Sequence, residues 1–328
     1  MKLAINGLGR IGRAALKVTL ERSEVEVVAV NDLADLETLK YLLRYDSVYG
    51  RWEKEIEIES GELRIGEARI KVLSEKDPEK LPRTDLGVDI VIESTGFFTD
   101  KVDAAKHLAA GAKKVIISAN SDDADLSVVM GVNHHLYDPT KHQVIANCSC
   151  TTNCAAPVMK VLNDNFTIRK AYMTTVHAVT ASQGLVDGPK KARREGRAAF
   201  TSIIPADTGA ADAVVRVLPK LEGRINGSAF RVPVLCGSVL EVVAHIAEET
   251  RPAEVNEIFK KAVVENFKGI IEVNEESLVS TDIIGTTASA IVDLPLTEVI
   301  QDFIRVVAWY DNEYAYACRL VDLVDYIK

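Results

Sequence analysis

The stretch Asn6-Gly7-Leu8-Gly9-Arg10-Ile11-Gly12 decides the fold of the first part of the chain. It follows the apolar run Leu3–Asn6, which predicts a strand, and it leads into Arg10–Glu21, whose apolar spacing predicts a helix. In such a turn the first glycine permits the tight bend, the second lets the backbone approach a pyrophosphate, and the third lets the helix pack on the strand. The free N–H groups at the helix start then favour phosphate. We therefore expect a dinucleotide site on Gly7, Gly9 and Gly12.

An acidic residue stands where a dinucleotide site needs one. The apolar run Val25–Asn31 predicts a second strand, and Asp32 follows it, 20 residues after Gly12. A carboxylate at this place hydrogen-bonds the ribose 2′-hydroxyl and repels a 2′-phosphate, which favours NAD over NADP. The alternative is that Asp32 only caps a helix or lies in a solvated turn.

Outward from this stretch, buried apolar strands alternate with helical patterns, which is typical of a parallel sheet with helices on both faces. We therefore predict an α/β fold: a Rossmann-type parallel sheet domain followed by an α+β catalytic domain with a mainly antiparallel sheet. The predicted domains are residues 1–149 plus a C-terminal helix at 313–328, and residues 150–312. The other elements expected in the first domain are Leu36–Tyr45, Glu55–Glu59, Glu62–Ile65, Ala68–Leu73, Val88–Glu93, Lys101–Ala110 and Val115–Ser118. Those expected later are strands at Ala171–Val179, Ser228–Pro233, Val239–Ala247, Ser289–Val292 and Arg305–Tyr310, and helices at Cys150–Asn163, Thr208–Leu218, Pro252–Asn266 and Asn312–Ile327.

Composition narrows the class of protein. The 328 residues are 47% hydrophobic and 27% charged, as in an ordinary globular protein of two domains. The net charge of −9 argues against nucleic acid as a partner. No apolar run is long enough for a membrane span, and the N-terminus is not a signal peptide. Five cysteines, three of them within seven residues, indicate a reducing compartment, so we expect a cytoplasmic protein.

A second motif, Asn147-Cys-Ser-Cys-Thr-Thr-Asn-Cys154, immediately precedes a helical pattern. Cys150 then lies in the first turn, where the helix dipole favours a thiolate and the free N–H groups favour an anion. His177, in a strand 27 residues later, is the best candidate for its base. The alternatives are a small buried cysteine and a hydrogen-bonded core histidine. The cysteine spacing is not typical of zinc, and we expect no metal.

Taken in order, the motifs of the whole chain resemble the NAD-dependent phosphorylating glyceraldehyde-3-phosphate dehydrogenase family. The residues that carry the resemblance are Asn6–Arg13, Asn31–Leu33, Tyr45–Val48, Ser94–Phe97, Ser149–Cys154, Thr174–Ala178, Ile204–Gly209, Arg231–Pro233 and Trp309–Glu313. The resemblance implies that Cys150 is the nucleophile and His177 its base. It implies that Thr180 and Arg231 bind the phosphate of glyceraldehyde 3-phosphate. It assigns the attacking inorganic phosphate to Ser149, Thr151, Arg197, Thr208 and Gly209.

For the cofactor, the resemblance implies that Asn312 fixes the nicotinamide carboxamide with Tyr316 packed nearby. The remaining NAD contacts that it implies are Gly7, Gly9, Arg10, Ile11, Gly12, Asp32, Lys76, Thr95 and Ser118. It further implies a homotetramer, in which the loop at about 178–203 shapes the cofactor site of a neighbouring subunit.

The implied chemistry is oxidation of the aldehyde to a Cys150 thioester, which phosphate cleaves to 1,3-bisphosphoglycerate. Several positions depart from the usual family pattern, among them Lys76, Asn120, Cys148, Cys236, Gly237 and Ala315. The alternatives are a sister enzyme that acts on erythrose 4-phosphate with water, a relative that uses arsenate, and a non-catalytic NAD-binding scaffold. Intact Cys150, His177, Arg231 and Asn312 argue against the scaffold.

Overall fold

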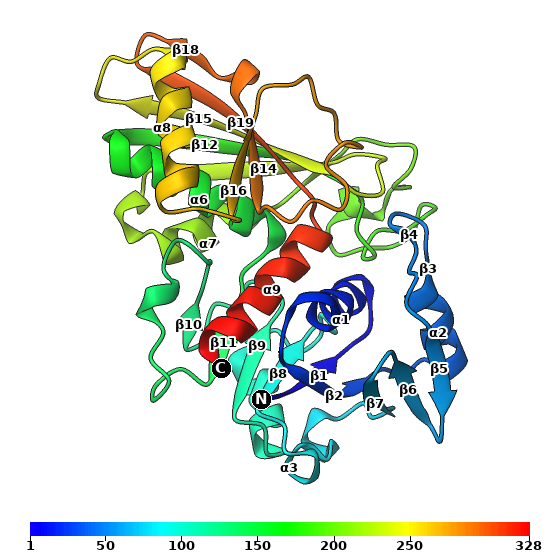
Figure 1. The fold of residues 1–328 in the computed structure, drawn as a ribbon. Helices are drawn as coiled ribbons and strands as arrows, with labels where there is room; N and C mark the ends of the chain where they lie inside the picture. The colour runs from blue at the N-terminus through cyan, green and yellow to red at the C-terminus, as the bar shows by residue number, and fades with distance from the viewer. The chain divides into compact units, whose positions relative to one another are not determined.

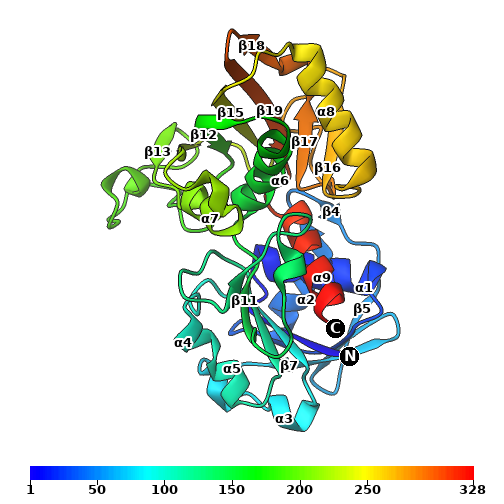
Figure 2. The same cartoon turned by 90° about the vertical axis from the view of Figure 1, so that its left-hand side faces the viewer.

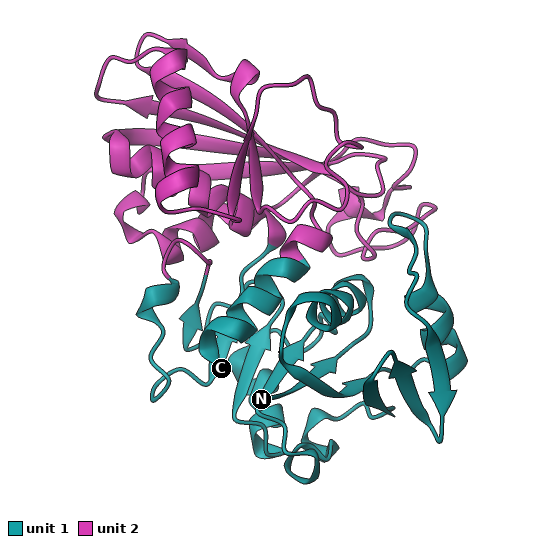
Figure 3. Cartoon of the chain, in the orientation of Figure 1, with its two compact units in different colours: residues 1–128, 134–149, 317–328 teal, residues 129–133, 150–316 magenta.

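A computed structural model describes all residues, 1–328, and the chain divides into two compact units (Figure 3). Unit 1 comprises residues 1–128, 134–149 and 317–328, and unit 2 comprises residues 129–133 and 150–316. The predicted boundaries placed residues 129–133 and 313–316 in the first domain instead. No helix is long and apolar enough to cross a membrane.

Unit 1 is built on a nine-stranded sheet in the order β10-β11-β9-β8-β1-β2-β7-β6-β5 (Figure 1). Neighbouring strands from β10 to β7 pair in parallel, and the β7-β6-β5 end is antiparallel, as predicted for those short strands. Its strands are β1 (Lys2–Asn6), β2 (Glu26–Asn31), β5 (Ile56–Glu59), β6 (Glu62–Ile65), β7 (Ala68–Leu73), β8 (Ile90–Glu93), β9 (Lys114–Ile117), β10 (Leu126–Ser127) and β11 (Val144–Ala146). A small separate ribbon joins β3 (Tyr45–Asp46) to β4 (Gly50–Arg51).

The helices of unit 1 follow the predicted pattern with three differences, the first of which is a short helix at Arg83–Leu86 that was not predicted. The helix predicted at 101–110 is two short helices, because the N–H groups of Leu108 and Ala109 both donate to the carbonyl of Ala105 and so tighten the turn there. The helix predicted at 36–45 ends at Arg44, because Tyr45 pairs with Arg51 in the small ribbon. The helices are α1 (Arg10–Arg22), α2 (Leu36–Arg44), α3 (Arg83–Leu86), α4 (Lys101–Ala104) and α5 (Lys106–Ala109).

Unit 2 is built on a mainly antiparallel sheet of eight strands, in the order β13-β14-β12-β15-β19-β17-β16, with β18 paired to β19 (Figure 2). Only β12-β14 and β16-β17 are parallel. Its strands are β12 (Ile168–His177), β13 (Ile204–Ala206), β14 (Ile225–Arg231), β15 (Ser238–Ile246), β16 (Ile271–Asn274), β17 (Ala290–Asp293), β18 (Glu298–Ile300) and β19 (Phe303–Tyr310). Its helices are α6 (Cys150–Asn165), α7 (Ala210–Val217) and α8 (Pro252–Glu265). The last helix, α9 (Tyr314–Ile327), continues into unit 1. The two sheets confirm the predicted fold class.

Candidate active site

The glycine turn of unit 1 lies at the carboxyl end of β1 and has no room for side chains at two of its three glycines. Gly7 has φ of +91°, and a Cβ there would meet the backbone nitrogen of Thr95 at 2.8 Å. A Cβ on Gly12 would lie 1.9 Å from the carbonyl oxygen of Gly7. A Cβ on Gly9 would meet no protein atom within 4 Å. The open space at Gly9, beside the N-terminus of α1, is therefore where a pyrophosphate can approach the backbone.

Asp32 reaches back to this turn from the end of β2. Its Oδ2 accepts a hydrogen bond of 2.7 Å from the backbone N–H of Leu8, and its Oδ1 accepts one of 2.9 Å from Ala34. Each carboxylate oxygen keeps further acceptor capacity for a ribose hydroxyl. The structure therefore places the carboxylate beside the turn, as the spacing of 20 residues predicted.

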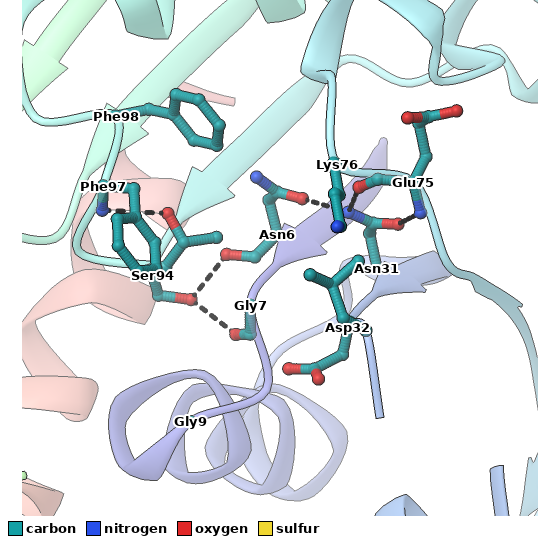
Figure 4. Close-up of a pocket in the computed structure, with 12 residues that line it drawn as sticks. Asn6, Gly7, Gly9, Asn31, Asp32, Glu75, Lys76, Ser94, Phe97 and Phe98 are labelled. Carbon is teal, nitrogen blue, oxygen red and sulfur yellow. Dashed lines mark hydrogen bonds between the residues drawn. The ribbon is translucent and has the colours of Figure 1, made fainter. Parts of the chain in front are cut away.

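A cavity of about 530 Å³ opens over the carboxyl ends of the central strands (Figure 4). It brings together five of the predicted cofactor residues, namely Gly7, Gly9, Asp32, Lys76 and Thr95. Phe97 and Phe98 lie on the opposite side of the cavity from Asp32 and Lys76. The cavity is also lined by seven residues that were not predicted to bind the cofactor: Asn6, Asn31, Leu33, Glu75, Ser94, Phe97 and Phe98. Five of these residues lie inside the motifs that carry the family resemblance, so the sequence did contain a signal for them: Asn6, Asn31, Leu33, Ser94 and Phe97.

Four predicted cofactor residues of unit 1 do not line this cavity. Arg10 pairs with Asp46 and lies over the ring of Tyr49, with its guanidinium carbon 5.6 Å from the ring centroid. Ile11 and Gly12 belong to α1, where Gly12 is packed against the Gly7 carbonyl. Ser118 donates its backbone N–H to the carbonyl of Glu93. The fixed backbone around Gly12 nevertheless shapes the turn that the cavity requires.

The second predicted motif spans the boundary between the units, but Cys150 and His177 both lie in unit 2. Cys150 begins α6, and His177 ends β12, so the two side chains meet although 27 residues separate them. The Cys150 Sγ lies 3.4 Å from the His177 Nε2. The His177 Nδ1 is 2.7 Å from the carbonyl oxygen of Ala178, so Nδ1 carries the hydrogen and Nε2 is free to accept a proton from the thiol. This is the arrangement of a nucleophile with its general base.

The directions of the two pKa shifts favour a neutral thiol on Cys150 and a neutral imidazole on His177 at neutral pH. Burial raises the pKa of the Cys150 thiol, although the charge of Arg231 and hydrogen bonds from Thr151 act in the opposite direction. Burial, with the charge of Arg231, lowers the pKa of His177 to about 4. We expected the helix N-terminus to hold Cys150 as a thiolate, and the structure corrects this because the cost of burying the charge is the larger effect.

Arg231 brings positive charge to the pair. It ends β14, directly opposite His177 in the parallel pairing of β12 and β14. Its Nη1 is buried and has no hydrogen-bond partner. A buried donor of this kind is costly unless something accepts its hydrogen bond, so an anion beside Cys150 fits this place.

A chain of hydroxyl groups supports the start of α6. The Tyr310 hydroxyl, buried on β19, lies 3.0 Å from the Thr151 Oγ1 and 2.7 Å from the Thr175 Oγ1. The Tyr310 ring also packs against the edge of the His177 ring, with centroids 6.0 Å apart. Tyr310 thereby connects α6 to β12 and β19, and it was not among the predicted site residues.

Asn312 is held in one orientation. Its Oδ1 accepts hydrogen bonds of 3.2 Å from the backbone N–H of Gly237 and 2.9 Å from the Ser238 hydroxyl. These two bonds fix the orientation of the amide, so its NH₂ group points away from Gly237 and Ser238 as a donor. Tyr316, two residues into α9, is buried. Cys236, one of the departures from the family pattern, donates its thiol to Asp311 at 3.2 Å.

Of the remaining predicted phosphate residues, Ser149 ends a segment of unit 1, and the others are spread over unit 2. Thr180 is half-buried, and its hydroxyl lies 2.9 Å from that of Ser182. The Thr208 Oγ1 accepts from the N–H of Ala210, and Gly209 precedes the first residue of α7. Arg197 is 66% exposed and pairs with Asp187 at 2.8 Å, so it requires an exchange of partners to bind phosphate. Ser149 directly precedes Cys150 and is half-buried.

Comparison with known proteins agrees with this geometry. The family model "Glyceraldehyde 3-phosphate dehydrogenase, NAD binding domain" matches residues 1–101, and "Glyceraldehyde 3-phosphate dehydrogenase, C-terminal domain" matches residues 149–312. The chain is 51% identical over 328 residues to the glyceraldehyde-3-phosphate dehydrogenase of Geobacillus stearothermophilus, which covers 100% of this chain and 98% of the relative. It is 49% identical to glyceraldehyde-3-phosphate dehydrogenase 1 of Bacillus subtilis, with the same coverage. The chain belongs to the glyceraldehyde-3-phosphate dehydrogenase family, a family of NAD-dependent oxidoreductases.

Proposed function

We propose that this chain oxidises glyceraldehyde 3-phosphate with NAD and inorganic phosphate to 1,3-bisphosphoglycerate, through a thioester on Cys150. The observation that carries the proposal is the Cys150 thiol placed 3.4 Å from the His177 Nε2, beside a buried guanidinium nitrogen of Arg231 that has no partner. The identity of about half of all residues to named members of the family supports the same reaction.

The proposed first step starts from the neutral pair that the directions of the two pKa shifts favour. As the Cys150 sulfur attacks the aldehyde carbon, the thiol proton passes to the His177 Nε2. The imidazolium then gives this proton to the new oxygen, which forms a hemithioacetal with a hydroxyl group. In the oxidation step His177 takes the proton back as a general base, and a thioester remains on Cys150.

We propose that NAD binds in the unit 1 cavity, where it supplies the hydride acceptor when bound. The open backbone at Gly9 and the Asp32 carboxylate fit the pyrophosphate and a ribose, respectively. The apolar rings of Phe97 and Phe98 fit the adenine base. Arg10, Ile11, Gly12, Lys76, Thr95 and Ser118 remain proposed contacts or supports of the same ligand. Asn312 has its amide nitrogen fixed as a donor, which suits a carboxamide oxygen, with Tyr316 nearby in sequence.

Two anions require two cationic or polar groups. We propose that Arg231 and Thr180 bind the phosphate of the substrate, and that Ser149, Thr151, Arg197, Thr208 and Gly209 bind the attacking phosphate. Arg231 is supported by its unpartnered buried nitrogen. Arg197 leaves Asp187 to bind phosphate, which is feasible because that ion pair is exposed and contributes little stability.

We also propose that the chain acts as a homotetramer in the cytoplasm. Leu185, Val186 and Ile203 are 74%, 76% and 69% exposed in the segment 178–203, which is costly in an isolated chain. All five cysteines are free thiols, which agrees with a reducing compartment.

Trapping the acyl intermediate tests the proposed reaction. Enzyme mixed with glyceraldehyde 3-phosphate and NAD without phosphate should release a burst of one NADH per site. Mass spectrometry of the acid-quenched protein should place the acyl group on Cys150, and the variant Cys150→Ser should show neither. An acyl group on another residue, or turnover without a burst, would refute the thioester route.

A further inference from the structure

We propose that Glu93 is a positioning residue for the cofactor, and that its carboxylate fixes the floor and one wall of the unit 1 cavity through Asn6 and Thr95. Glu93 ends β8, is 2% exposed and does not itself line the cavity. The proposal rests on the proposed function, because it assumes that NAD occupies this cavity.

Glu93 is a hub of hydrogen bonds from three parts of unit 1. Its Oε1 accepts from the backbone N–H of Thr95 at 2.8 Å and from the Thr95 hydroxyl. Its Oε2 accepts from the Asn6 amide nitrogen and lies 3.0 Å from the His107 Nε2. Each carboxylate oxygen therefore has two polar contacts, which fix the orientation of the Glu93 side chain.

The network continues along the carboxyl edge of the sheet. The Asn6 Oδ1 accepts from the Asn31 amide nitrogen at 2.7 Å, and the Asn31 side chain exchanges hydrogen bonds of 2.8 and 2.9 Å with the backbone of Glu75 (Figure 4). Glu93, Asn6 and Asn31 end the strands β8, β1 and β2, and Glu75 follows β7. These four strands are neighbours in the sheet. The network thus joins four strand ends, and Asn6, Asn31 and Glu75 all line the cavity.

A second arm of the network holds the wall that carries the aromatic rings. The Thr95 Oγ1, which donates to Glu93, also accepts the backbone N–H of Phe97 at 3.1 Å. Gly96, between them, has φ of +75°, so the loop turns sharply at this point. Phe97 is 83% exposed at the cavity and has little other packing to hold it. The conformation of this wall therefore depends on the Thr95 contacts with Glu93.

The charge of Glu93 is balanced within the core. Arg83 in α3 and His107 in α5 are both fully buried, and both interact electrostatically with Glu93. Burial lowers the pKa of Arg83 to about 10, so this guanidinium stays charged at neutral pH. Burial and the charge of Arg83 lower the pKa of His107, which stays neutral. Removing the Glu93 charge alone would leave Arg83 as an uncompensated buried cation, so a clean test removes both charges.

The test compares the double variant Arg83→Met/Glu93→Gln with the wild type. The amide introduced at position 93 must turn its NH₂ group toward donors on one side, which breaks the contacts with either Thr95 or Asn6. Calorimetric titration should show the Kd for NAD raised at least tenfold. The kcat at saturating NAD and the KM for glyceraldehyde 3-phosphate should stay within a factor of two. The control Leu63→Ala removes a buried side chain of β6 outside the cavity, and it should lower the melting temperature without changing the Kd for NAD.

A second pair of variants covers the case in which the double variant does not fold. His107→Leu removes a donor to Glu93, and His107→Gln keeps one. The first should weaken NAD binding severalfold, and the second should restore it. A wild-type Kd for NAD in folded Arg83→Met/Glu93→Gln or in His107→Leu would overturn the proposal.

The same titration separates this inference from the proposed function. If Asp32→Ala binds NAD as tightly as the wild type, NAD does not occupy this cavity, and both proposals fail. If Asp32→Ala weakens binding while the Glu93 and His107 variants do not, only the positioning role fails.

Discussion

At the residue scale, the central feature is the proton between Cys150 and His177. The ring orientation is set by the Nδ1 contact with the Ala178 carbonyl, so the Nε2 lone pair points at the thiol. Burial keeps both groups neutral, because it raises the pKa of the thiol and lowers the pKa of the imidazole to about 4. The resting site therefore has a weak nucleophile with a base in contact.

This description predicts the pH dependence of alkylation. The rate of Cys150 alkylation by iodoacetamide in the ligand-free enzyme should rise continuously from pH 6 through pH 9, because a raised thiol pKa leaves only a growing minority of thiolate. Peptide mapping should find the label on Cys150, since the other four cysteines are buried. A plateau above an apparent pKa near 6 would instead show a thiolate–imidazolium pair in the resting enzyme.

Arg231 makes a separate prediction about the substrate phosphate. Arg231→Met should lower kcat/KM for glyceraldehyde 3-phosphate by about 10- to 100-fold, since a hydrogen bond to a charged group contributes about 1.5–3 kcal/mol. Unphosphorylated glyceraldehyde is the control substrate, and its kcat/KM should change much less. Equal losses for both substrates would assign Arg231 to the thiol rather than to the phosphate.

At the element scale, the glycines of the turn between β1 and α1 differ in what they contribute to folding and to ligand binding. The three glycines fit one motif, but their surroundings differ: a Cβ at Gly12 would lie 1.9 Å from a carbonyl oxygen, while a Cβ at Gly9 meets no protein atom. Gly12 is thus required for packing, while the proposed role of Gly9 is to let a ligand approach the backbone.

Matched alanine variants test this difference. Gly12→Ala should lower the free energy of unfolding by about 1–3 kcal/mol, because the backbone must move to relieve the clash. Gly9→Ala should leave the melting temperature unchanged and raise the Kd for NAD by more than about tenfold. Both quantities can be followed by calorimetry. Loss of stability in Gly9→Ala, with NAD affinity retained, would contradict the assignment.

The sequence allowed the long elements and the two motifs to be predicted, because these depend on local patterns. The 3.6-residue spacing of α1 and the continuous apolar run of β1 are both confirmed. The contacts of Tyr310 with Thr151 and of Glu93 with Asn6 and His107 were not predicted, because each joins residues more than 10 apart in sequence through the tertiary fold. The predicted lowering of the Cys150 pKa was wrong for a related reason. The position of Cys150 at a helix start can be predicted from the sequence, but its burial cannot.

At the scale of the whole molecule, the proposed cofactor cavity and the proposed catalytic groups lie in different units. Unit 1 has the glycine turn and the cavity at the carboxyl ends of parallel strands, which is the usual location for a nucleotide. Unit 2 has the thiol, its base and the free guanidinium nitrogen. Cys150, His177 and Arg231 therefore all lie on the main sheet of unit 2 or on α6.

The proposed assembly makes a prediction about an exposed apolar side chain. Val186 is 76% exposed in the segment 178–203, and Val102 is 76% exposed on α4. Light scattering of the wild type should give four times the chain mass of 35.8 kDa. Val186→Asp should shift the mass to smaller species, because a charge is costly in a buried interface, while Val102→Asp should not. A wild-type protein that elutes as a monomer would refute the tetramer.

The most direct test of the account measures NADH formation from glyceraldehyde 3-phosphate and NAD with and without inorganic phosphate. We expect sustained turnover only when phosphate or an anion of the same shape is present, because such an anion must cleave the thioester on Cys150 before the next cycle. Arsenate should replace phosphate in this assay. Sustained turnover in the absence of both anions would contradict the account, since water would then cleave the thioester, and erythrose 4-phosphate would be the next substrate to assay.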